Sequence, residues 1–78
     1  MNIYKVERLD DWDYDEFDSI VCYSENEDNA KKIQPQPCLF GEKYFAPYWK
    51  EENLKVELIG YNDKVTEEGI ILSSFNAG

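Results

Sequence analysis

The most distinctive chemistry in this sequence is a run of carboxylates interleaved with aromatic rings near the start of the chain. Segment 10–18 has six acidic residues, three aromatic residues and no basic residue. In an extended segment, alternate carboxylates project on one side about 6.6 Å apart, an interval similar to that between phosphates along a DNA strand. The segment is therefore predicted to bind a protein partner with a basic cleft, through Asp10, Asp11, Trp12, Asp13, Tyr14, Asp15, Glu16 and Asp18.

This segment has two other interpretations. Carboxylate runs often belong to solvated loops that flank core aromatics, and this alternative stays open. A calcium-binding EF-hand loop is matched at its first three ligand positions by Asp11, Asp13 and Asp15. However, Glu16 stands where that loop requires glycine and Cys22 stands where it requires a bidentate glutamate. We therefore expect no dedicated metal site and no cofactor.

A second unusual stretch, residues 40–49, is rich in aromatic rings. Pro47 fits the first position of a short helix reaching about residue 52, with Tyr48 and Trp49 in its first turn. Such rings either close the open side of a sheet, as a small domain requires, or form an exposed patch. If exposed, the patch predicts contact with a partner or self-association into a homo-oligomer through Tyr44, Tyr48 and Trp49.

Catalysis is not expected from this set of residues. The chain has no histidine, which is the commonest general acid or base, and neither Cys22 nor Cys38 has a visible activating partner. The four glycines form no phosphate-binding motif. We expect that the protein is not an enzyme and that the two cysteines are small buried apolar groups rather than a disulfide.

Length and charge restrict the remaining classes. A chain of 78 residues, 42% hydrophobic, predicts a single domain over residues 1–78. The net charge of −9 comes almost entirely from residues 1–30, which carry ten acidic and two basic residues. This charge is expected to prevent direct binding to nucleic acid or to anionic membranes. Without a signal-peptide pattern or a long apolar run, we expect a soluble, cytoplasmic protein.

Several elements must hold these segments in place. Alternation predicts a strand over 3–9, with Tyr4 and Val6 on one face, and a second strand over 17–23. The acidic segment 10–16 is expected to join them as a hairpin, either as an open loop or as a projecting ribbon. Ser24 and Glu27 have capping-box spacing, which predicts a helix over about 25–33. Its narrow inward face would consist of Ala30 and Ile33.

Two further strands complete the predicted fold. In the stretch 54–58, Leu54, Val56 and Leu58 are expected to face the core, and a fourth strand is expected over 69–75. We expect these two strands to pair antiparallel with each other across the turn-rich stretch 60–64. The predicted fold class is α+β: one small antiparallel sheet, in the order β-β-α-β-β, packed against one short helix.

Several parts of the sequence resemble small uncharacterised acidic bacteriophage proteins. They are Tyr14-Asp15-Glu16-Phe17-Asp18-Ser19-Ile20-Val21, leading through Ser24-Glu25 into Asn29-Ala30-Lys31-Lys32-Ile33, then the strand Leu54-Lys55-Val56-Glu57-Leu58-Ile59-Gly60 and the tail Gly69-Ile70-Ile71-Leu72-Ser73-Ser74-Phe75-Asn76-Ala77-Gly78. The resemblance covers about half the chain, and the tail is its most specific part. It implies a phage context, in which small acidic proteins are often inhibitors of host nucleic-acid enzymes. Together with the charge pattern, it predicts an inhibitor of the anti-CRISPR or anti-restriction kind, acting by nucleic-acid mimicry in the host cytoplasm. The alternative is a structural or accessory phage protein that assembles through segment 40–49.

Overall fold

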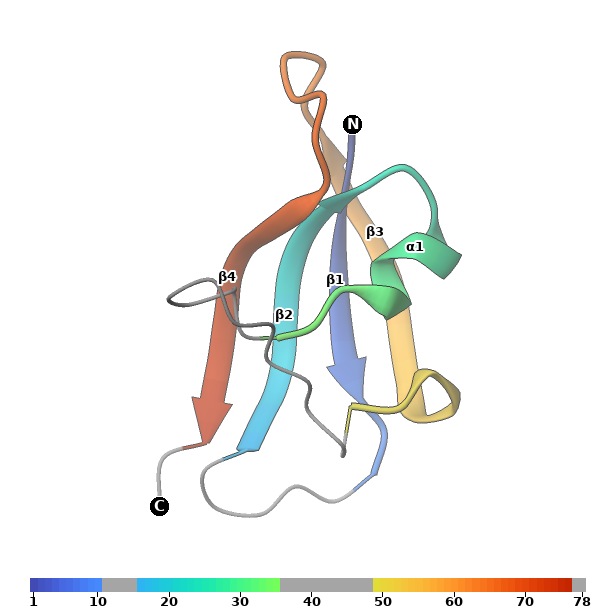
Figure 1. Ribbon diagram of the computed structural model, residues 1–78, viewed down its shortest axis with the longest axis vertical. Helices are drawn as coiled ribbons and strands as arrows, with labels where there is room; N and C mark the ends of the chain where they lie inside the picture. The colour runs from blue at the N-terminus through green and yellow to red at the C-terminus, as the bar shows by residue number, and fades with distance from the viewer. Residues whose placement is uncertain (11–15, 36–48, 77–78) are drawn as a thin grey trace.

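The computed structural model describes residues 1–10, 16–35 and 49–76, without the side chains of Glu16, Phe75 and Asn76. In chain order, its elements are β1 (Asn2–Arg8), β2 (Glu16–Ser24), α1 (Glu27–Lys32), the 3₁₀ turn η1 (Glu51–Asn53), β3 (Leu54–Tyr61) and β4 (Gly69–Asn76). The strands form one antiparallel sheet in the order β3-β1-β2-β4, with α1 packed on one face (Figure 1). This confirms the predicted α+β class and the hairpin of β1 with β2.

The core lies between the sheet and α1, where the alternation of β1 places it. Tyr4 and Val6 are buried, and their register partners on β2, Cys22 and Ile20, are buried with them. Ala30 is the buried residue of α1, and it packs into the same cluster. Because cross-strand partners point to the same face of a sheet, β1 and β2 together supply one side of this core, and Trp49 and Leu54 also belong to the buried cluster.

The expectation that the third and fourth strands pair with each other is wrong, since β3 and β4 form opposite edges of the sheet. The connection 62–68 crosses the ends of β1 and β2 (Figure 1). Three strand spacings amount to about 14 Å, whereas a connection of this length reaches about 23 Å, so the crossing is sterically easy. It is tied to β1, because the Met1 ammonium group donates to the Asn62 carbonyl and the Asn62 amide donates to the Met1 carbonyl.

The inward face of β3 is only partly as predicted. Leu54 is buried and Val56 is half-buried against the core, but Leu58 is 57% exposed. Among the described strands, β3 has a neighbour on one side only, and its register with β1 is broken next to Leu58.

The helix also begins two residues later than the capping box predicted. Asn26 is the N-cap, with extended backbone angles, and its Oδ1 accepts a hydrogen bond from the Asn29 amide at 2.8 Å. Ser24 is fully buried as the last residue of β2 and is not the helix cap. Glu27 and Asp28 lie in the first turn of α1, and Lys31 and Lys32 lie in its last turn, which suits the helix dipole.

The aromatic segment is described at one residue, Trp49, which is 4% exposed and belongs to the core. The short helix predicted from Pro47 is instead a 3₁₀ turn that begins at Glu51, so Trp49 precedes it. Tyr44 and Tyr48 lie outside the described residues. In the described part of the chain, no helix is long and apolar enough to cross a membrane.

Candidate functional site

The candidate site begins at Arg8, the last residue of β1, which lies at the point where the acidic segment leaves the sheet. Its guanidinium makes a bidentate pair with Asp10: Nε donates to Oδ1 and Nη2 donates to Oδ2, both at 2.9 Å. Nη1 donates to the carbonyl oxygen of Phe17, on β2, at 3.4 Å. One side chain therefore holds the chain on both sides of residues 11–15.

The strand period explains why an arginine occupies this position. Arg8 continues the inward series of Tyr4 and Val6, so its side chain is only 2% exposed. A buried cation is strongly disfavoured unless it is paired, and the planar guanidinium suits a bidentate carboxylate and a carbonyl at the same time. The Leu9 amide, which donates to the Asn53 carbonyl at 2.7 Å, fixes the same turn against η1.

This geometry changes the interpretation of Asp10. Hydrogen bonds from Arg8, together with the positive charges of Arg8 and Lys50, hold the pKa of the Asp10 carboxyl below its usual value. Both oxygens are occupied within the chain, so Asp10 anchors the acidic segment and is not one of its outward carboxylates. The acidic run alone does not predict this pair; the signal is a basic residue at an inward strand position, two residues before Asp10.

The remaining predicted partner-binding residues divide into two groups. Asp18 lies on β2 at an irregularity of the β2–β4 register, and its Oδ1 accepts from the Ser19 hydroxyl at 3.2 Å. Asp11, Trp12, Asp13, Tyr14, Asp15 and the side chain of Glu16 lie outside the described residues. The candidate site that the structure brings together is therefore the anchor of the segment, formed by Arg8, Asp10 and Phe17, with Asp18 beside it.

The face of the sheet opposite α1 shows a different charge pattern. In the register of β1 with β3, Lys5 stands opposite Glu57 and Glu7 stands opposite Lys55, and Lys5 Nζ lies 3.8 Å from Glu7 Oε2. Acids and bases are equal in number in this group of four, so it adds nothing to the net charge. Its composition does not suit a polyanion-binding or a polycation-binding surface.

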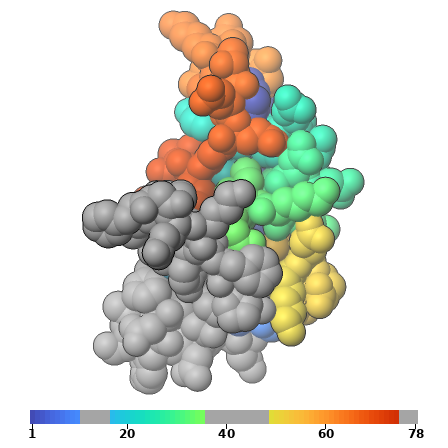
Figure 2. Space-filling model, viewed as in Figure 1, coloured from blue at the N-terminus to red at the C-terminus, as the bar shows by residue number. Residues whose placement is uncertain are grey.

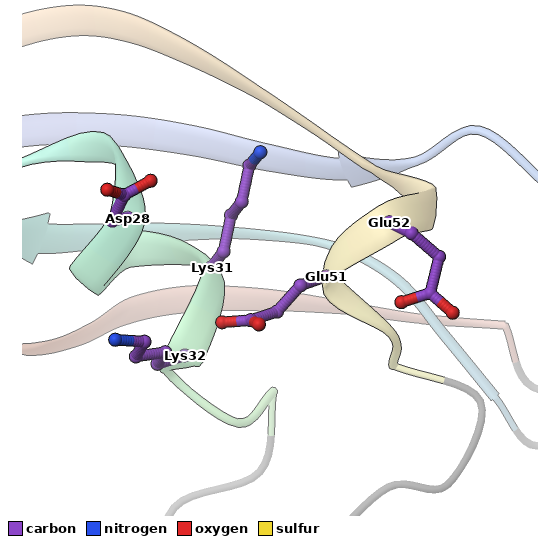
Figure 3. Close-up of a pocket in the computed structure, with 5 residues that line it drawn as sticks. All are labelled: Asp28, Lys31, Lys32, Glu51 and Glu52. Atoms are coloured by element: carbon purple, nitrogen blue, oxygen red, sulfur yellow. The ribbon is translucent and has the colours of Figure 1, made fainter.

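A groove runs between α1 and η1, which are neighbours on the surface (Figure 2). Its larger part has a volume of about 520 Å³, and Trp49 and Lys50 contribute to its wall. In the adjoining part, Glu51 points from η1 toward α1, whereas the ends of Lys31 and Lys32 point away from η1 (Figure 3); the lining residues there are Asp28, Lys31, Lys32, Glu51 and Glu52. Both lysines and carboxylates therefore line this groove. In the described part of the chain, no group of three or more His, Cys, Asp or Glu residues could hold a metal ion.

A second polar cluster, at the other end of the sheet, was not foreseen. Glu68 Oε2 lies 2.6 Å from the Ser24 hydroxyl and accepts from the Glu25 amide at 3.0 Å. These hydrogen bonds lower the pKa of Glu68. Burial, followed by the negative charge of Glu68, raises the pKa of the nearby Cys22 thiol to about 11. Cys22 is a free, buried cysteine, as predicted, and Cys38 lies outside the described residues.

No known protein family, curated protein or solved structure matches this chain.

Proposed function

We propose that this protein is a small acidic inhibitor that binds a basic, nucleic-acid-binding surface of another protein by imitating a polyanion. In a phage context, which the sequence resemblance suggests, that partner is a host defence protein. The observation that supports the proposal is the anchor at Arg8. This single residue fixes the chain at Asp10 and at Phe17, so the strongly acidic stretch between them starts and ends at defined positions on the sheet.

The charge balance of the segment favours a basic partner. Segment 10–18 carries six carboxylates, and Arg8 contributes one positive charge, so an excess of five negative charges remains. Two carboxylates about 6.6 Å apart in water repel each other by about 0.6 kcal/mol. A cleft lined by Lys and Arg removes this repulsion and replaces it with attraction, which accelerates association and makes affinity depend on salt.

Anchoring also lowers the cost of binding. A loop whose two ends are fixed has less conformational freedom to lose when it enters a cleft than a free tail of the same composition. Arg8 therefore serves the proposed function indirectly, by positioning the acidic segment.

The test is affinity capture from a host lysate at low and at moderate salt, followed by competition with a DNA duplex for the captured protein. The informative variant changes Asp11, Asp13 and Asp15 to Asn. Its matched control removes three exposed carboxylates elsewhere through Glu25→Gln, Asp63→Asn and Glu67→Gln. Both variants raise the net charge by three.

We expect the wild type and the control to capture the same partner, to release it as salt rises and to be displaced by DNA, whereas the Asn variant captures nothing. A complex that the Asn variant forms equally well, or that moderate salt does not weaken, overturns the proposal. The alternative, assembly through segment 40–49, loses support at Trp49, because that side chain is buried in the core.

A further inference from the structure

The fourth strand, β4, is an edge of the sheet with unusual composition. It pairs with β2 on one side, and no other strand of the described residues pairs with its opposite side. Its eight residues, Gly69–Asn76, include no charged residue and no proline. The opposite edge, β3, carries Lys55 and Glu57. Natural edge strands usually carry lysine or proline to discourage pairing with another chain, and β4 has neither.

Large apolar side chains are exposed in the middle of this strand. Ile71 is 45% exposed and Leu72 is 65% exposed. Val21 stands opposite Leu72 and Cys22 stands opposite Ile70, so Ile71 is the additional residue at a break in register. An uncharged edge with adjacent exposed aliphatic groups is a favourable template for one more strand.

We infer that β4 pairs antiparallel with β4 of a second copy of this chain, about a two-fold axis near Ile71 and Leu72. In such an interface, the same strand lies on both sides of the two-fold axis. A charged residue near that axis would therefore lie close to the same charge on the second copy. The absence of charge on β4 removes this obstacle. The self-association expected from the sequence is thereby assigned to β4 and not to Trp49.

The large net charge does not oppose this pairing, because of where the acidic segment joins the sheet. Asn76, at the end of β4, stands opposite Glu16, at the start of β2. Antiparallel pairing of two β4 strands places these ends, and the acidic segments attached to them, at opposite ends of the pair, about 30 Å apart. Since the Debye length is about 8 Å at physiological salt, the two segments barely repel each other.

Sedimentation velocity across about 10 μM to about 1 mM tests the inference. We expect the wild type to shift from monomer to dimer and the Leu72→Lys variant to remain monomeric. Leu58→Lys is the matched control, because Leu58 is 57% exposed on the other edge strand; this variant should dimerise as the wild type does. Circular dichroism and thermal unfolding establish that both variants are folded.

Two further measurements make the result independent of one substitution. A mixture of Leu72→Lys and Leu72→Glu variants, each monomeric alone, should form a heterodimer, because the two charges then attract. In the wild type, hydrogen exchange of β4 amides should slow as concentration rises. A wild type that stays monomeric throughout, assemblies that grow beyond a dimer, or a dimer lost in Leu58→Lys and kept in Leu72→Lys would each overturn the inference.

Discussion

Replacement of Asp10 by alanine is the most direct test of the anchor at the acidic segment. The change removes both hydrogen-bond acceptors of the Arg8 guanidinium at Nε and Nη2. The Arg8 side chain is 2% exposed, so it cannot simply turn into water to replace them. We therefore expect Asp10→Ala to destabilise the fold, although the substituted residue lies near the surface.

The expected magnitude lies between two known limits. An exposed ion pair contributes at most about 1 kcal/mol, whereas breaking a fully buried pair costs about 3–5 kcal/mol. Here the cation is buried and the Asp10 side chain is 35% exposed, so water partly screens the pair. We expect a loss of about 2 kcal/mol in the free energy of unfolding, which for a domain of this size lowers the Tm by roughly 10 °C.

Urea and thermal unfolding at neutral pH measure this loss. The control is Glu7→Gln, which affects the exposed Lys5–Glu7 pair at 3.8 Å and should cost less than about 0.5 kcal/mol. The double variant Arg8→Met, Asp10→Ala should recover part of the loss, since it removes the buried guanidinium together with its carboxylate partner. If Asp10→Ala is no less stable than Glu7→Gln, the anchor does not contribute to the fold and the reasoning is refuted.

The pH dependence follows from the same pair. The pKa of Asp10 is lowered in the folded state from an ordinary value of 3.8, so the stabilisation is complete well above that value and is lost as pH falls through the lowered pKa. The difference in stability between wild type and Asp10→Ala should accordingly shrink below about pH 4.

Three other predictions concern the end of the sheet near α1. The pKa of Glu68 is lowered from its ordinary value of 4.5, so the ionised carboxylate stabilises the fold at pH values above 4.5. The destabilisation by Glu68→Gln in urea unfolding should therefore be larger at pH 7 than at pH 3. Equal losses at the two pH values would contradict the Ser24 contact. In a Cys38→Ser background, Cys22 should react with a thiol reagent only on unfolding, and stability should fall as pH rises from 9 towards 11, because the unfolded thiol ionises first. Asn26→Ala should cost about 1 kcal/mol by thermal unfolding, and no loss would show that Asn26 is not the helix cap.

The parts of the fold that local pattern determines were predictable. The burial of Tyr4 and Val6 follows from the two-residue period of a strand, and the small buried face of α1 follows from the period of a helix. Both periods can be recognised in a single sequence. The strand alternation of residues 54–58 was also visible, but Leu58 is exposed on an edge strand, next to a break in the register of β1 with β3. The burial of a strand residue depends on the neighbouring strands, which local alternation does not show.

The predictions that were wrong concern contacts between residues that are distant in sequence. Ser24 has the spacing of a capping box with Glu27, yet its hydroxyl donates to Glu68, which lies 44 residues later in the chain. Glu68 also accepts from the Glu25 amide, and so Asn26 is left to begin the helix. Local spacing cannot reveal such competition, and the same applies to the choice of strand order.

The two ends of the sheet differ in how their carboxylates are balanced, and this contrast supports the proposal that the acidic segment binds a partner. At the end near α1, the carboxylate of Glu68 is satisfied by Ser24 and Glu25 of its own chain, which is sufficient for a structural role. At the other end, one guanidinium anchors the segment, and five negative charges exceed what Arg8 supplies. One pair of an arginine with a carboxylate, such as Arg8 with Asp10, is enough to anchor a loop. The excess charge adds repulsion without strengthening the anchor, and under the proposed function a basic surface of the partner would offset that repulsion.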